Sequence, residues 1–126
     1  MHTKTTKQPM TLTDVIAYDD FIFAYGTFLD KFKNSSEKAT MIEHPPAIKD
    51  ANKEHLCVLA AAAHKLANDN HLPVPRWVND PIYKMPHPIF AFDTKRESFR
   101  KLLMETTPYE FASRNIFCGA DATSRA

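Results

Sequence analysis

Residues 72–88 read LPVPRWVNDPIYKMPHP, and this stretch holds five of the nine prolines and the only tryptophan of the chain. Proline fixes its own φ, lacks a backbone N–H and disfavours helix at the residue before it. The stretch therefore cannot form the middle of a long helix, yet it is too aromatic for an empty linker. We predict a rigid, proline-rich irregular strap over residues 72–92, which separates two helical blocks and lies across one shared core.

The block before the strap carries patterns typical of helices. Apolar side chains recur at spacings of three and four between residues 15 and 32, and either Thr11 or Thr13 can cap the start of that helix. A short helix should follow and end before Pro45-Pro46. A third helix is expected from residues 48–50 to Asn70, because it contains the alanine run at residues 60–63 and alanine has the highest helix propensity.

The block after the strap is shorter. Residues 89–92 are apolar and form either an extended edge or a buried connector. Thr94 and Glu97 have the spacing of a capping box, and Thr107-Pro108 marks a second helix start, so two helices should meet there with a sharp change of direction. Together these elements predict an all-α fold, a compact bundle of about five helices. We expect a single domain over residues 11–126 behind a flexible N-terminus at residues 1–10.

Composition narrows the functional classes. The chain has 126 residues and a formal net charge of +1, so no global field attracts nucleic acid or an anionic membrane. Its two glycines are too few for a phosphate-binding loop, and its two cysteines do not form a secreted disulfide scaffold. Asp19, Asp20 and Asp30 interrupt the apolar run at residues 15–32, which excludes an ordinary transmembrane span. We therefore expect a cytoplasmic protein with no membrane contact.

Candidate catalytic and metal-binding residues do not assemble into a motif. His64 and His71 could share a helix face, but the sequence supplies no further ligands at the spacing of a zinc site. Cys118 lies near Arg114, although no base accompanies it as nucleophilic catalysis requires. We expect no catalytic residue, no metal and no cofactor, and hence a protein that is not an enzyme.

Two places are candidates for protein binding. Arg76 and Trp77 are residue types that dominate interface energetics, although Trp77 can instead pin the strap onto the helical core. Phe21 and Phe28 widen the apolar side of the first long helix beyond what one core requires, so we expect them to form a face for self-association. Both places predict an interaction domain that binds a protein partner or a second copy of itself.

A basic stretch supports an alternative function. Its residues are Lys95, Arg96, Arg100 and Lys101. At these spacings the side chains can meet phosphates, which would make the chain a nucleic-acid-binding accessory protein. The competing interpretation is that the charges solvate one face of a helix whose other face buries Phe99, Leu102 and Leu103.

A pattern of turn and packing residues extends over residues 72–126. Its elements are LPVPRWV at residues 72–78, ETTP at residues 105–108, Phe111, RNIF at residues 114–117 and the terminal Arg125-Ala126. It resembles the pattern of small uncharacterised bacterial helical proteins, where it follows helix-turn-helix regulators or occurs in antitoxin-like genes beside a nucleotidyltransferase-like toxin. The resemblance implies a non-enzymatic bacterial regulatory domain of antitoxin-like type. This chain lacks a clear helix-turn-helix ahead of the pattern, so the resemblance does not imply direct DNA binding.

Overall fold

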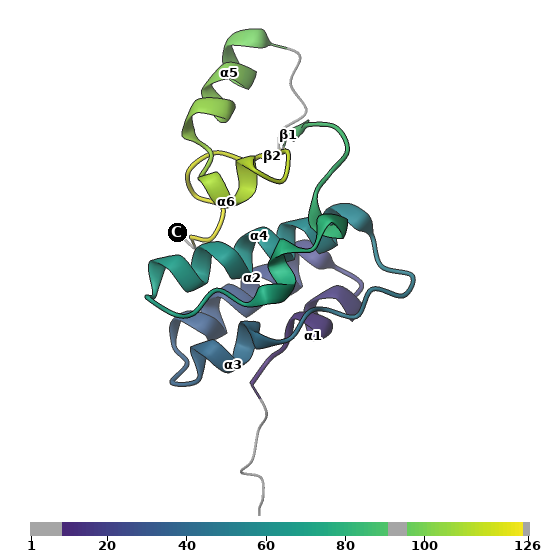
Figure 1. Ribbon diagram of the computed structural model, residues 1–126, viewed down its shortest axis with the longest axis vertical. Coiled ribbons are helices and arrows are strands. Elements are labelled where there is room, and N and C mark those ends of the chain that lie inside the picture. The colour runs from purple at the N-terminus through teal and green to yellow at the C-terminus, as the bar shows by residue number, and fades with distance from the viewer. Residues whose placement is uncertain (1–8, 91–95, 125–126) are drawn as a thin grey trace, which may run out of the picture.

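The computed structural model describes residues 9–90 and 96–124 and shows a mostly helical fold (Figure 1), which confirms the all-α class. Six α-helices form in this part of the chain, where about five were expected, and none is long and apolar enough to cross a membrane. The elements are α1 (Leu12–Ala17), α2 (Phe21–Lys33), α3 (Lys38–Glu43), α4 (Lys53–Asp69), the 3-10 helices η2 (Arg76–Asn79) and η3 (Pro81–Tyr83), β1 (Ile89–Phe90), α5 (Glu97–Thr106), α6 (Tyr109–Ala112) and β2 (Ile116–Phe117).

The single long helix expected near the N-terminus is two helices, α1 and α2, in the structure. Tyr18 has an extended backbone, and Asp20 caps α2 by accepting a hydrogen bond from the Phe23 amide at 3.0 Å. Short aspartate side chains stop a helix in this way because they bond nearby backbone N–H groups. At the start of α1, the Thr11 hydroxyl accepts from the Asp14 amide, and the Asp14 carboxylate accepts from the Thr11 amide. This capping box confirms Thr11 as the first cap.

Helix α4 lies at the centre of the molecule and separates two apolar clusters. Its alanine run at residues 60–63 is fully buried. Ala60 and Ala63 belong to the larger cluster, which is completed by α1, α2, α3 and the strap. Ala61 and Ala62 belong to the smaller cluster, together with residues of α6 and β2. Small side chains let neighbouring elements approach α4 closely on both sides, so one helix supports both clusters.

The strap folds into the 3-10 helices η2 and η3, which both pack against α4 (Figure 1). Trp77 donates its indole N–H to the Ile42 carbonyl at 3.0 Å, and its ring meets the ring of Tyr83 edge-on. Val78 and Tyr83 are buried in the larger cluster. The strap is therefore part of the larger apolar cluster.

The C-terminal part adds a helical arm to this body. Helices α5 and α6 meet at Thr107-Pro108, where the chain changes direction as expected. Strands β1 and β2 pair in parallel, with Ile89 opposite Ile116, so Ile89 and Phe90 form an extended edge, while residues 91 and 92 lie outside the described residues. Helix α5 extends away from the other helices (Figure 1). The helices that pack together are therefore α1 to α4 and α6, and α5 lies outside the compact bundle that was expected.

Candidate functional site

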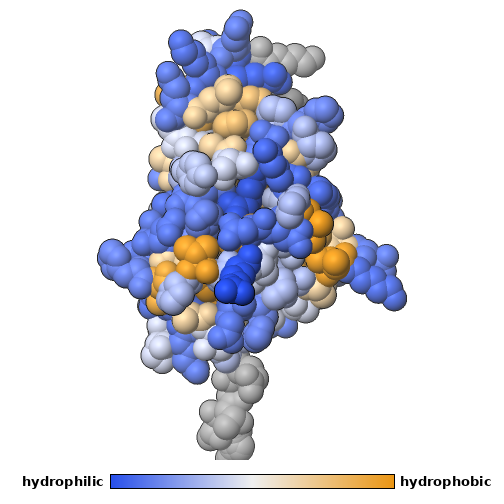
Figure 2. All heavy atoms as spheres, in the orientation of Figure 1, coloured by the Kyte–Doolittle hydropathy of each residue, from blue (hydrophilic) through white to orange (hydrophobic). Residues whose placement is uncertain are grey.

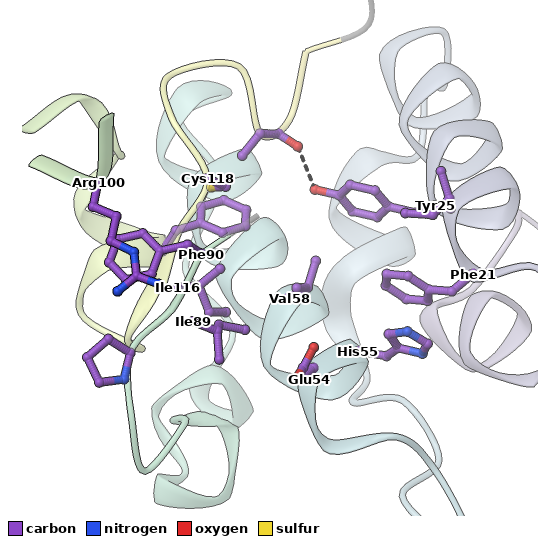
Figure 3. Close-up of a pocket in the computed structure, with 14 residues that line it drawn as sticks. Phe21, Tyr25, Glu54, His55, Val58, Ile89, Phe90, Arg100, Ile116 and Cys118 are labelled. Carbon is purple, nitrogen blue, oxygen red and sulfur yellow. Dashed lines mark hydrogen bonds between the residues drawn. The ribbon is translucent and has the colours of Figure 1, made fainter. Parts of the chain in front are cut away.

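An open cleft of about 680 Å³ lies between α2, α4, the β1–β2 pair and α5 (Figure 3). Helix α2 forms one wall, α4 forms the floor, and β1 with α5 forms the opposite wall. Most of the side chains that line the cleft are apolar. The lining side chains that can carry charge are Tyr25, Glu54, His55, Arg100 and Cys118.

The α2 wall is built from stacked rings. Phe21 lies between His55 and Tyr25, with its ring centroid 3.9 Å from the imidazole and 5.8 Å from the phenol (Figure 3). The Tyr25 hydroxyl donates to the Ala122 carbonyl at 2.8 Å, and burial raises the pKa of this phenol, so the donor stays protonated. Burial lowers the pKa of His55, so its imidazole is neutral at pH 7. The wall is therefore aromatic and uncharged.

The opposite wall combines apolar side chains with one cation. Ile89 and Phe90 come from β1, and the Phe90 ring stacks on the Phe117 ring with centroids 5.4 Å apart. Arg100 reaches from α5, and its guanidinium carbon lies 4.9 Å from the centre of the Phe90 ring. A guanidinium over an aromatic face gains a cation–π attraction. Arg100 thus ties α5 to β1 and places a positive charge at the cleft.

Cys118 does not have the environment of a nucleophile. Burial raises the pKa of its thiol to about 11, so very little of it is thiolate at neutral pH.

Within residues 9–90 and 96–124, no three His, Cys, Asp or Glu side chains converge as a metal site requires. The chemistry that the cleft does offer is that of a binding site, with apolar walls and few charges.

A second exposed feature, which we call the α1–α2 corner, adjoins the cleft at the bend between these helices. It consists of Tyr18, Ile22 and Phe23, which are 55%, 77% and 59% exposed. The rings of Tyr18 and Phe23 lie 5.9 Å apart, and Ile22 also lines the cleft. Apolar patches on the face shown in Figure 2 are small islands among hydrophilic residues. Tyr18, Ile22 and Phe23 place three exposed apolar side chains within one bend of the chain.

The structure shows how the predicted protein-binding residues are used. Phe28 is 1% exposed in the larger cluster, and Phe21 is buried at the cleft wall. The Phe28 ring is closed to a second copy, whereas the Phe21 ring stacks on His55 and Tyr25 at the wall of the cleft. Trp77 is half-buried and pins the strap to the core, while Arg76 beside it is exposed. The apolar side chains that α2 does leave exposed belong to the α1–α2 corner.

The predicted basic site is described only in part. Thr94 and Lys95 lie outside the described residues, but the expected capping box is wrong, because α5 begins at Glu97 directly after Arg96 and has no side-chain cap. Arg96 precedes α5, Lys101 lies on it, and both are exposed, as is Arg100, whose guanidinium also stacks on a ring at the cleft. The described cations of α5 therefore have different surroundings, and one of them contributes to the cleft.

The apolar side of α5 is only partly buried. Leu103 is buried as expected, but Leu102 is 51% exposed, so its predicted burial is wrong. The reason is the position of α5, which extends away from the other helices (Figure 1). Met104 is also exposed there. A pattern that indicates one apolar face does not show how much of that face a neighbour covers.

Arg114, which the sequence analysis considered as a neighbour of Cys118, is a buried cation. Arg114 is 7% exposed, and its guanidinium donates to the Glu110 and Val78 carbonyls, both at 2.7 Å. Its Nη1 also lies 3.2 Å from Nδ1 of His64. The guanidinium thereby joins α4, α6 and the strap. The signal that could have revealed it is its position as a lone charge in the apolar stretch at residues 111–118.

We expect acid to weaken the contact between Arg114 and His64. Arg114 has only N–H donors, so the 3.2 Å contact requires a His64 Nδ1 that carries no proton. Burial and the adjacent guanidinium lower the pKa of His64 from 6.5, so the unfolded chain binds this proton more readily than the folded chain. The contribution of His64 to the free energy of unfolding is therefore complete above about pH 6.5 and is lost as the pH falls below that value.

Urea unfolding at pH 7.5 and pH 5.5, followed by circular dichroism, measures this pH dependence. The parent should unfold at a lower urea concentration at pH 5.5, and His64→Gln should remove part of the difference. The remaining difference in stability between the two pH values is expected from His55, whose pKa is also lowered by burial. An unchanged pH dependence in His64→Gln would show that the contact does not respond to protonation.

None of the known protein families, curated proteins and solved structures compared with this chain matches it significantly. The resemblance of residues 72–126 to small bacterial helical proteins therefore stays a prediction. Several residues of that pattern have structural roles in this chain. Asn115, whose φ is +64°, donates to the Met85 carbonyl at 2.7 Å, and the Thr107 hydroxyl accepts from the amides of Cys118 and Gly119. These bonds hold the strap and the C-terminal turn in place.

Proposed function

We propose that this chain is a non-catalytic protein-interaction domain that binds a partner through the α1–α2 corner. The observation that supports the proposal is the exposure of three large apolar side chains within one bend, Tyr18, Ile22 and Phe23, two of which have rings 5.9 Å apart. Single exposed apolar residues are common on soluble proteins, whereas contiguous ones mark interaction sites. Two of the three are aromatic, and aromatic side chains are enriched in interfaces.

The surroundings of the corner indicate the chemistry of the partner. Asp19 and Asp20 are exposed within the same bend, so the apolar centre has an acidic rim. A partner with an apolar surface bordered by lysine or arginine complements this arrangement. Two identical corners would bring four aspartates together, which disfavours that form of self-association. An antitoxin-like or regulatory role, as the resemblance implies, would require a partner protein of this kind.

We expect Phe23→Asp to weaken partner binding by about 30-fold or more, the effect of removing a hot-spot residue. The substitution should leave the fold intact, because the Phe23 ring is exposed. Ile48→Asp is the matched control, since Ile48 is similarly exposed but lies outside the corner. The partner is captured by crosslinking to the immobilised parent chain and then purified, and its Kd for each variant is measured by calorimetry.

The proposal fails if the purified partner binds Phe23→Asp as tightly as it binds the parent. Light scattering of the parent alone tests for a second copy at the same surface. A dimer that Phe23→Asp dissociates and Ile48→Asp does not would identify the partner as another copy of this chain, and the argument from the acidic rim would then be wrong.

A further inference from the structure

We infer that the cleft between α2 and the β1–α5 wall binds a small amphiphilic carboxylic acid, with its apolar part between the walls and its carboxylate at Arg100. The inference goes beyond the proposed function, because it concerns the interior of the cleft and not the α1–α2 corner. Either can hold without the other.

The size and lining of the cleft suit a small organic ligand. Its volume of about 680 Å³ lies within the range of roughly 300–1,000 Å³ that ligand pockets occupy. Val58 on the floor and Ile89 on the far wall are apolar, and both lie across from the Phe21 ring (Figure 3). A hydrocarbon chain between these surfaces would lose contact with water on two sides, and the loss of exposed apolar area favours binding.

Arg100 supplies the positive charge that a carboxylate needs. Among the described residues that line the cleft, it is the only lysine or arginine. A guanidinium has five N–H donors in a planar fork, so it can bind a carboxylate while it keeps its stacking on Phe90 and its other contacts. Hydrogen bonds between two charged groups are stronger than neutral ones. The apolar wall and the charge next to it thus match the two ends of an amphiphilic acid.

Glu54 sets the direction in which such a ligand lies. It is in the first turn of α4, where the positive end of the helix dipole offsets part of its charge. Arg100 comes from α5, on the other side of the cleft (Figure 3), and His55 is neutral. A ligand carboxylate is therefore attracted to the α5 side and repelled from the α4 side. A cationic amphiphile would have to pair with Glu54, whose negative charge the helix dipole partly offsets, so we expect it to bind more weakly.

Three probes that share a ten-carbon chain test the inference: decanoate, decanol and decylamine. Each is titrated into the ¹⁵N-labelled full chain and followed by NMR. We expect saturable shifts of the amides around Val58 and Ile89. Decanoate should bind about tenfold more tightly than decanol, because only decanoate forms charge-assisted hydrogen bonds with Arg100. Decylamine should bind the most weakly of the three.

Three variants assign the two parts of the site. Arg100→Gln should reduce the affinity for decanoate to that for decanol. Lys101→Gln removes a neighbouring charge of the same sign and should leave the affinities for decanoate and decanol unchanged. Val58→Trp fills the floor of the cleft and should abolish binding of all three probes. If this variant does not fold, Arg100→Gln and Lys101→Gln still decide, because an unchanged affinity for decanol shows that the apolar walls remain in place although Arg100 no longer stacks on Phe90.

Several results would overturn the inference. One is the absence of saturable decanoate binding at millimolar concentration, and another is an affinity for decanoate that equals the affinity for decylamine. Equal effects of Arg100→Gln and Lys101→Gln on decanoate binding would also overturn it. Shifts confined to the α1–α2 corner would overturn it as well, because decanoate would then only cover an exposed apolar patch. Phe23→Asp should leave decanoate binding unchanged, since Phe23 does not line the cleft. This variant separates a failure of the inference from a failure of the proposed function.

Discussion

Replacing Arg114 by alanine is expected to lower the free energy of unfolding by about 3 kcal/mol or more, because two carbonyl groups lose their donor at once. The Glu110 and Val78 carbonyls each accept from the guanidinium at 2.7 Å. They belong to α6 and η2, so this side chain joins the C-terminal part to the strap. Alanine reaches neither carbonyl and leaves a cavity where the buried guanidinium lay.

Equilibrium unfolding in urea, followed by far-ultraviolet circular dichroism, measures the loss. Arg114→Lys should give an intermediate value, because an ammonium on a flexible stem lacks the planar fork that bonds both carbonyls. Arg76→Ala is the matched control, since Arg76 is exposed and its removal should change the free energy of unfolding by less than about 0.5 kcal/mol. Similar losses in the two alanine variants would contradict a structural role for Arg114.

The parts of the fold that the sequence predicts best depend on local backbone preferences. The alanine run at residues 60–63 lies inside α4, and the prolines of residues 72–88 exclude a long helix there. The change of direction at Thr107-Pro108 also follows from its own residues. In each place the local residues favour or exclude a helical backbone, so the outcome depends little on distant parts of the chain.

The break between α1 and α2 was missed because the apolar spacing continues across it. Periodicity reports which side chains face a core, and two helices that pack on the same core preserve it through a bend. The side chain of Asp20 starts a new helix at this point, because it accepts a hydrogen bond from the Phe23 amide. An aspartate next to another aspartate is also common on the surface of an unbroken helix, so its presence alone did not distinguish the two outcomes.

The cleft could not be predicted, because its walls come from distant parts of the chain. Arg100 was recognised as a basic residue, but its place over the Phe90 ring depends on where α5 lies relative to β1. Similarly, the apolar pattern of α2 does not show whether Ile22 or Phe28 faces water. That depends on which helices cover α2, and their packing is a property of the whole fold.

Phe28→Ala is expected to lower the free energy of unfolding by about 3–5 kcal/mol, whereas Ile22→Ala on the same helix should cost less than about 0.5 kcal/mol. Phe28 is buried in the larger cluster, where its ring stacks on Phe32 with centroids 6.3 Å apart. Truncation there removes apolar area from the core and leaves a cavity. The Ile22 side chain is mostly in water, so it has little burial to lose. The same urea experiment measures both variants.

The comparison also tests the surface on which the proposed function depends. Both substitutions delete apolar atoms from α2 and replace a weaker helix former with alanine, so helix propensity changes in the same direction in both. The difference between the two losses therefore reports burial at the two positions. Similar losses would mean that the side of α2 that carries Ile22 also packs on the core. The α1–α2 corner would then not be exposed, and the proposal that a partner binds there would fail with it.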